Sequence, residues 1–223
     1  SKLYRSSVAV FGLGGVGGHC TEALARAGIG SLFLTDADTV APSNINRQSI
    51  AFLSTVGQKK TEVIKQKLSD INPDCAVIVC DSFVLPENIE QVFSSFPCTP
   101  DYIVDAIDTV SAKIALASYA VSHNIPIIAS MGTGNKLHPE AFKIADIYDT
   151  NVCPLCRVMR RELKKRGIPA LKVLYSEEPP RMPLTAGEEK SSGRPAPASI
   201  SFVPSVAGLL IAGEVIRSLS GVS

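Results

Sequence analysis

The sequence predicts an α/β fold whose core is a doubly wound, mainly parallel sheet. Short apolar segments alternate with helical patterns along the chain, and a cluster of glycines joins the first apolar segment to the first helix. The 223 residues are enough for one large α/β domain. We therefore expect a single domain with a core at 1–135 and a C-terminal strand and helix extension at 136–223.

The individual elements follow from local patterns. Strands are predicted where apolar, largely β-branched residues run together, at Ser7–Phe11, Leu32–Asp36, Ala76–Cys80, Tyr102–Ala106 and Pro126–Ala129. Helices are predicted where apolar residues return every three or four positions, at Val16–Ala27, Thr55–Ile71, Ser111–Ser122 and Ser205–Leu219. The stretch 176–198 is rich in proline, glycine and charge without periodicity, so we expect a long, mobile loop there.

The junction of the first strand and first helix reads VAVFGLGGVG, which is typical of a Rossmann-like nucleotide site. Free N–H groups at the start of a helix attract an anion, and Asp36 closes the next strand, where a carboxylate can bind ribose hydroxyls. NAD, FAD and ATP all fit this pattern, and a glycine turn without a ligand is the alternative. The four glycines concerned are Gly12, Gly14, Gly15 and Gly17.

Two cations and one carboxylate favour ATP among these nucleotides. Arg47 and Lys60 follow the second strand, and Asp108 follows the fourth. When a carboxylate attacks the α-phosphate of ATP, negative charge builds on the departing pyrophosphate, and cations with Mg²⁺ stabilise it. Hydride transfer needs no such charges. Taken alone, the arginine and the lysine could be ordinary surface residues and the aspartate a helix cap, but the three converge on one sheet edge.

The motifs GLGGVG, LTDAD, SNINRQ, VGQKK and DAIDTV together closely resemble the ThiF/MoeB/HesA group of the ubiquitin-activating-enzyme-like superfamily. That group adenylates carboxylates with ATP and Mg²⁺. The resemblance implies a single adenylating domain, a homodimer, Arg47, Lys60 and Asp108 as catalytic residues, and Asp108 as the Mg²⁺ ligand. It also implies a nucleotide-binding set around the glycine turn, comprising Asp36 on the ribose and Asn44, Arg47, Gln48 and Lys60 around the phosphates.

Within that group, GTGNKLHPEAFKIADI and CPLCRVMRRELKKRGI are most similar to a branch of tRNA-modifying dehydratases. The similarity implies that the chain activates the threonine carboxylate of threonylcarbamoyladenosine in tRNA, which then closes into a ring. Three alternatives stay open: an adenylyltransferase for the C-terminal glycine of a ubiquitin-like sulfur carrier, an NAD-dependent oxidoreductase, and a non-catalytic nucleotide-binding module. The three charged residues argue against the last two.

A basic segment, 155–166, is the candidate RNA contact. If it is helical, its apolar residues Leu155, Val158, Met159 and Leu163 share one face. The opposite face then carries the predicted RNA-binding residues Arg157, Arg160, Arg161 and Lys164. The net charge of +1 offers no global attraction to nucleic acid, so an ordinary solvated face is the alternative.

The cysteines predict a reduced, cytoplasmic protein. Four of the six are scattered singly, and the pair Cys153 and Cys156 supplies only two of the four ligands that structural zinc requires. We therefore expect no zinc, and either a reduced surface pair or a redox-sensitive dithiol. The missing second CxxC pair argues mildly against a sulfur-carrier partner. No apolar stretch reaches the length of a membrane span, so no membrane contact is expected.

Overall fold

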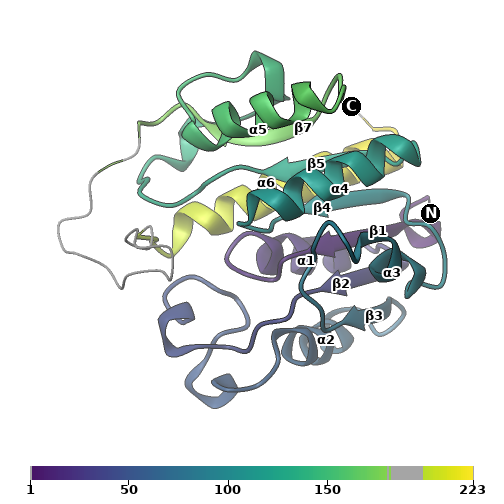
Figure 1. Ribbon diagram of the computed structural model, residues 1–223. Helices are drawn as coiled ribbons and strands as arrows, with labels where there is room; N and C mark the ends of the chain where they lie inside the picture. The colour runs from purple at the N-terminus through teal and green to yellow at the C-terminus, as the bar shows by residue number, and fades with distance from the viewer. Residues whose placement is uncertain (1, 180, 182–197, 223) are drawn as a thin grey trace.

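The computed structural model describes residues 2–179, 181 and 198–222, and one seven-stranded sheet runs through it (Figure 1). The strand order is β3-β2-β1-β4-β5-β7-β6, and β6 alone in this order runs antiparallel to its neighbour. This confirms the predicted doubly wound, mainly parallel sheet. The strands are β1 (Ser7–Phe11), β2 (Ser31–Thr35), β3 (Ala76–Cys80), β4 (Tyr102–Asp105), β5 (Ile127–Ser130), β6 (Phe142–Asp146) and β7 (Lys172–Ser176).

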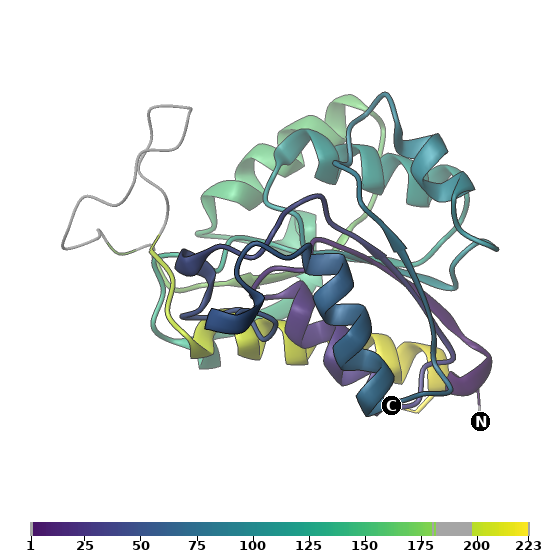
Figure 2. The same cartoon turned by 90° about the horizontal axis from the view of Figure 1, so that it is seen from below.

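Helices cover both faces of the sheet (Figure 2). One face carries α1 (Gly17–Arg26), α2 (Lys60–Ile71) and α6 (Phe202–Ser220), and the other carries α3 (Ile89–Ser94), α4 (Val110–Ser122) and α5 (Pro154–Lys165). Sequence patterning did not locate α3, β6 or β7. The predicted start of α2 was also too early. Gly57 adopts a φ of +85°, which is not helical, and the helix begins only at Lys60.

Strand β1 is buried on both sides and explains why both faces need helices. Val8 and Val10 belong to the core cluster that includes α1, α2 and α6, whereas Ala9 and Phe11 belong to the cluster beneath α3 and α4. Successive side chains of a strand point to opposite faces, so a fully apolar strand must be covered twice. The packed centre holds the carboxyl ends of the strands in fixed positions.

Helix α6 is the one helix in the described part of the chain that is long and apolar enough, by length and composition, to cross a membrane. It packs along α1, and its residues Ala207, Ile211, Ala212 and Val215 are buried in the core shared with the sheet. A buried core helix has the same composition, so these contacts account for its apolar character.

The predicted loop at 176–198 falls mostly on residues 180 and 182–197, which lie outside the described residues. At its start the prediction was wrong. Ser176 ends β7 with no exposure, and Glu178 is 8% exposed. The charged composition of this stretch concealed the fact that its first residues pack against the segment after β5.

The structure confirms a helix at the basic segment but corrects its faces. In α5, Cys156, Met159 and Leu163 are buried, whereas Val158 is exposed. Arg160 turns toward the protein, where its Nη1 donates to the carbonyl of Thr150 at 2.9 Å and also contacts the Thr150 hydroxyl.

The dithiol is also not at the surface. Cys153 is 4% exposed and Cys156 is 0% exposed, so the expectation of a surface pair was wrong. Both cysteines belong to the core cluster that joins α4, α5 and β7.

Candidate active site

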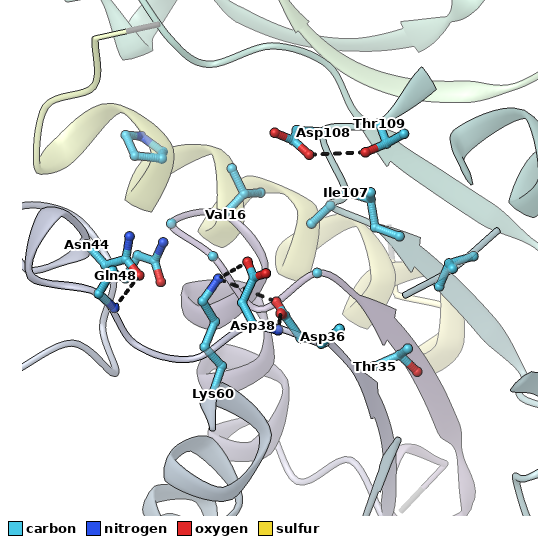
Figure 3. Close-up of a pocket in the computed structure, with 18 of the residues that line it drawn as sticks. Val16, Thr35, Asp36, Asp38, Asn44, Gln48, Lys60, Ile107, Asp108 and Thr109 are labelled. Carbon is cyan, nitrogen blue, oxygen red and sulfur yellow. Dashed lines mark hydrogen bonds and ion pairs between the residues drawn. The ribbon is translucent and has the colours of Figure 1, made fainter. Parts of the chain in front are cut away.

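A cleft of about 590 Å³ lies at the carboxyl ends of β1, β2 and β4 (Figure 3). This volume is within the range of small-molecule sites. The structure brings nearly all of the predicted nucleotide-binding residues to its walls. They are Gly12, Gly14, Gly15, Asp36, Asn44, Arg47, Gln48, Lys60 and Asp108.

The glycines of the turn serve two different purposes. Gly12 has a φ of +87°, and a Cβ there would lie 2.8 Å from the Ala106 carbonyl oxygen. A Cβ at Gly17, which does not line the cleft, would lie 1.7 Å from the Gly12 carbonyl oxygen. At Gly14 a Cβ would meet only the Gln48 Nε2, at 3.6 Å. Packing therefore requires Gly12 and Gly17, and Gly14 leaves room for a ligand.

Lys60 lies between two carboxylates on the wall formed by β2 (Figure 3). Its Nζ is 2.7 Å from Asp38 Oδ2 and 3.8 Å from Asp36 Oδ2, and its side chain is 6% exposed. Asp36 is itself fixed, because it accepts hydrogen bonds from the backbone N–H groups of Leu13 and Asp38. The sequence analysis gave Asp38 no role, although the LTDAD motif contains it. The buried ammonium is thus oriented before any ligand binds.

Arg47 is held by a chain of hydrogen bonds. Its Nη1 donates to the Ser43 carbonyl and to Asn46 Oδ1, both at 2.8 Å, and burial lowers the pKa of Arg47. Asn46 Nδ2 in turn donates to the Ser199 carbonyl at 2.9 Å. Asn46 and Ser199 were missed by the sequence analysis, because their contact spans 153 positions. The arginine is therefore tied to the segment that leads into α6.

Two buried polar atoms on the cleft walls have no hydrogen-bond partner among the described residues. They are Thr35 Oγ1 and Gln48 Oε1. Buried polar atoms are nearly always paired in native proteins, so unpaired ones require an explanation. A ligand with hydroxyl and amino groups, such as a nucleoside, would supply the partners.

A buried ion pair supports the turn that carries Asp108. Lys113 Nζ is 3.1 Å from Asp105 Oδ2, and each side chain is 1% exposed. Lys113 also donates to the Ser130 carbonyl at 2.7 Å, and Asp105 accepts from the Ile107 N–H at 3.1 Å. Burial raises the pKa of Asp105, against the effect of Lys113. The pair links β4, β5 and α4, and so fixes the backbone on which the exposed Asp108 lies.

The predicted RNA-binding residues are not in the cleft. Arg157, Arg161 and Lys164 are exposed on α5, whereas Arg160 is bonded to Thr150. Glu162 accepts from Arg161, Lys165 and Arg166, which lowers its pKa to about 2. Part of the positive charge of the helix is therefore neutralised locally.

The parallel sheet, the glycine turn and the cations at its edge define a nucleotide-binding α/β protein. The chain belongs to the ThiF family, whose model matches residues 1–223.

Individual relatives extend this likeness. The chain is 43% identical over 226 aligned positions to the tRNA threonylcarbamoyladenosine dehydratase of Bacillus subtilis, covering 97% of this chain and 88% of that protein. The crystal structure of E. coli tRNA N6-threonylcarbamoyladenosine dehydratase in complex with ATP has a TM-score of 0.87 and 30% identity, covering 98% of this chain and 87% of that one. The same E. coli enzyme in complex with AMP also has a TM-score of 0.87, with 31% identity.

Proposed function

We propose that the chain is an ATP-dependent dehydratase that adenylates the carboxylate of threonylcarbamoyladenosine in tRNA and promotes its cyclisation. One observation carries the proposal: Lys60 and Arg47 line the same cleft as the glycine turn, where the phosphates of a bound nucleotide belong. The names of the relatives support the substrate, and the relatives' complexes with ATP and AMP support the nucleotide.

The proposed reaction has two steps. A carboxylate oxygen of the modified adenosine attacks the α-phosphorus of ATP, and the bond to pyrophosphate breaks. A nucleophilic atom of the same modified base then attacks the activated carbonyl, closes the ring and releases AMP. Lys60 and Arg47 stabilise the charge that develops on the phosphates, and both side chains are already oriented by their neighbours. Asp36 binds the ribose hydroxyls from the end of β2.

Magnesium is part of this proposal, with Asp108 as its protein ligand. Mg²⁺ is usually bound through one or two carboxylates together with phosphate oxygens, and Asp108 is exposed on the cleft wall. The described residues contain no group of three or more His, Cys, Asp or Glu suited to a metal. A metal held jointly by one carboxylate and the nucleotide fits this arrangement. Bound there, Mg²⁺ would neutralise charge on the phosphates.

Two surfaces support the proposed partners, which are tRNA and a second copy of the chain. The exposed cations of α5 are the proposed tRNA contact. The outer side of α6 exposes Leu209 at 53% and Leu210 at 40%, which supports a homodimer covering this face. We place the protein in the cytoplasm, where modified tRNA and ATP are both available. Light scattering at micromolar concentration tests the dimer, and a monomer mass would contradict it.

Turnover with three candidate substrates tests the function. The chain is incubated with ATP, Mg²⁺ and one of three molecules: tRNA containing threonylcarbamoyladenosine, the same tRNA without the modification, or a ubiquitin-like carrier protein. We expect release of AMP and pyrophosphate only with modified tRNA, together with loss of one water from the nucleoside by mass spectrometry. Release of AMP with the carrier protein alone would instead assign the chain to the sulfur-carrier adenylyltransferases.

A further inference from the structure

Cys153 and Cys156 form a compact dithiol at the start of α5, outside the ATP cleft. Cys153 is the N-cap residue of the helix and Cys156 lies in its first turn, so both thiols are on one side of the same turn. A disulfide requires two sulfur atoms that can approach each other, and side chains three positions apart at the start of a helix are neighbours.

The surroundings of Cys153 favour its thiolate. The Cys156 thiol, the backbone N–H groups of Cys156 and Leu155, and the Lys136 cation together lower the pKa of Cys153, although burial opposes them. Thiolates at helix N-termini and beside cations are the reactive form of cysteine. These neighbours therefore favour the thiolate of Cys153 more than water favours that of an ordinary cysteine.

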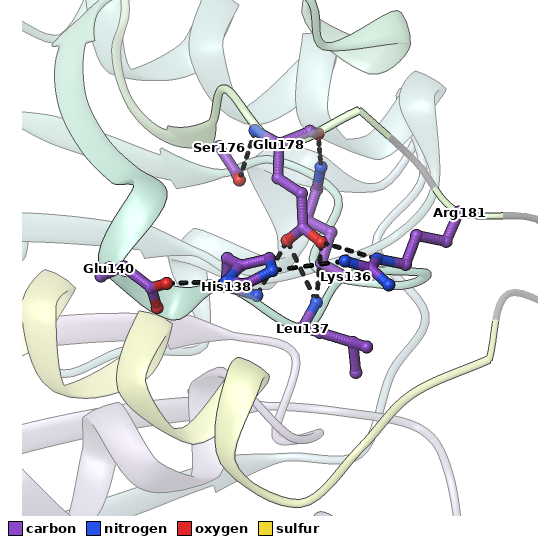
Figure 4. A network of polar contacts seen from close by, with 7 residues as sticks. All are labelled: Lys136, Leu137, His138, Glu140, Ser176, Glu178 and Arg181. Atoms are coloured by element: carbon purple, nitrogen blue, oxygen red, sulfur yellow. Dashed lines mark hydrogen bonds and ion pairs between the residues drawn. The ribbon is translucent and has the colours of Figure 1, made fainter.

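Lys136, whose cation acts on Cys153, is held by a polar network. Figure 4 shows the residues of this network. Its Nζ donates to the Glu178 carbonyl at 2.6 Å, and the residue is 6% exposed. The Glu178 carboxylate accepts from the backbone N–H groups of Leu137 and His138 at 2.9–3.0 Å, and Arg181 Nε lies 3.4 Å from it. Burial lowers the pKa of Lys136, and the two cysteines and Glu178 oppose that shift. The cation is thus a fixed part of the site.

The two cysteines have different roles in this arrangement. Cys156 has no exposed surface, and the hydrogen bond to Cys153 together with burial raises its pKa. Cys153 retains 4% exposure and follows Val152, which is exposed and has a φ of +56°. Positive φ at a β-branched residue is an outlier that costs energy and clusters at functional sites. Cys153 is therefore the thiol that an incoming reagent meets first.

We infer that Cys153 and Cys156 are a thiol–disulfide exchange site that low-molecular-weight disulfides oxidise reversibly. The Cys153 thiolate attacks one sulfur of the reagent, so that a mixed disulfide forms and one thiolate leaves and takes up a proton. The Cys156 thiol then loses its proton, and its sulfur attacks Cys153 Sγ and displaces the second thiol. In total, two protein thiols become one disulfide and one reagent disulfide becomes two thiols.

Mass spectrometry of the full chain treated with oxidised glutathione tests this inference. Peptide mapping after alkylation is expected to show the peptide with both cysteines lighter by two hydrogens and unalkylated, and dithiothreitol is expected to restore both thiols. The exposed Cys98 provides the internal comparison, because it is not part of a CxxC pair. Under the same conditions it should carry at most a glutathione adduct. A reduced dithiol alongside a modified Cys98 would overturn the inference.

Variants separate the two roles and require no measurement of activity. In Cys156→Ser the mixed disulfide at Cys153 cannot be resolved, so one glutathione should remain bound there, whereas Cys153→Ser should leave Cys156 reduced. Lys136→Met should shift the midpoint of the pH profile for alkylation of Cys153 upward relative to the wild type, because Lys136 lowers the pKa of Cys153. An unchanged profile in Lys136→Met, or a persistent adduct on Cys156, would contradict the assignment. Circular dichroism spectra that match the wild type establish that each variant is folded.

Discussion

The ATP cleft and the Glu178 network, defined as Lys136, Leu137, His138, Glu178 and Arg181, lie in two halves of one sheet and are built differently. The cleft uses side chains at the ends of strands that are neighbours in the sheet, and in the turns after those strands. The network uses one carboxylate to bind backbone N–H groups across 40 positions of sequence. Side chains that meet a ligand must be of particular types, whereas a backbone N–H can come from nearly any residue. The cleft therefore leaves a motif in the sequence and the network does not.

The charged side chains of the two regions also differ in whether a ligand can compete for them. Lys60 is paired with Asp38, whose side chain is 55% exposed, so a phosphate can compete for the lysine. Glu178 already receives two backbone N–H groups and has little exposure. We expect substitutions at the cleft surface to reduce catalysis and leave stability unchanged, and substitutions in the network to do the reverse.

The largest expected effect concerns the buried ion pair beneath the cleft, where we expect a substitution to reduce stability. Replacing Lys113 with Met leaves Asp105 as an unpaired buried carboxylate, and breaking such a pair costs about 3–5 kcal/mol in free energy of unfolding. Urea denaturation measures it. The matched control is Lys172→Met, which removes an ion pair to Glu214 whose lysine is 43% exposed. That change should cost at most about 1 kcal/mol. Equal losses in the two variants would show that Asp105 is satisfied without Lys113.

The same contrast explains what the sequence could predict. The strands β1 to β5, α1, α4 and most of the residues that line the cleft were predictable, because apolar strands, glycine turns and charged strand ends depend on nearby residues. Arg160 was assigned to the wrong face, because helical spacing gives no information on its hydrogen bond to Thr150. The predicted start of the loop at 176–198 was also wrong, because the hydrogen-bond partners of Glu178 lie some forty residues earlier in the chain. Helical or loop patterns describe local preference, and long-range hydrogen bonds override it.

The second effect concerns the cations of the cleft. Arg47→Ala and Lys60→Ala should each fold normally and lose about a hundredfold in AMP formation, because removing one oriented charge at a transition state costs on the order of 3 kcal/mol. Pyrophosphate release at saturating ATP is the measurement, and unfolding by urea confirms the fold. Near-normal AMP release by both variants would remove the basis for the proposed adenylation.

The third effect is a loss of stability in the network. Glu178→Gln keeps the shape but replaces one acceptor oxygen with an amide NH₂ group. A buried N–H group then lacks a good partner, which should cost about 1–3 kcal/mol in free energy of unfolding. Burial raises the pKa of Glu178, but the hydrogen bonds from the His138 and Leu137 N–H groups help to lower it, and the net effect is a lowered pKa. Its stabilisation is therefore present above the pKa of an ordinary glutamate and is lost as the pH falls through the lowered value.

Urea denaturation at several pH values checks this, with Glu140→Gln as the control because the Glu140 side chain is 72% exposed and contacts His138 Nδ1 at 2.7 Å. The difference in free energy of unfolding between Glu178→Gln and the wild type should become smaller in acid. The free energy of unfolding of Glu140→Gln should stay near that of the wild type at every pH. A difference that is independent of pH would mean that the charge of Glu178 is not what stabilises the network.

The smallest expected effect concerns tRNA binding to α5. Since Arg160 bonds Thr150 and Arg161 pairs with Glu162, the cations best placed to meet phosphates are Arg157 and Lys164, both exposed. Each neutralised phosphate adds nearly one unit to the dependence of log affinity on log salt, so Arg157→Glu with Lys164→Glu should weaken tRNA binding and lower that slope by about two units. The control, Arg26→Glu with Lys65→Glu, makes the same change in net charge on α1 and α2, across the sheet from α5. Equal losses in both pairs would indicate a general effect of charge, and unchanged binding in the first pair would place the tRNA on another surface.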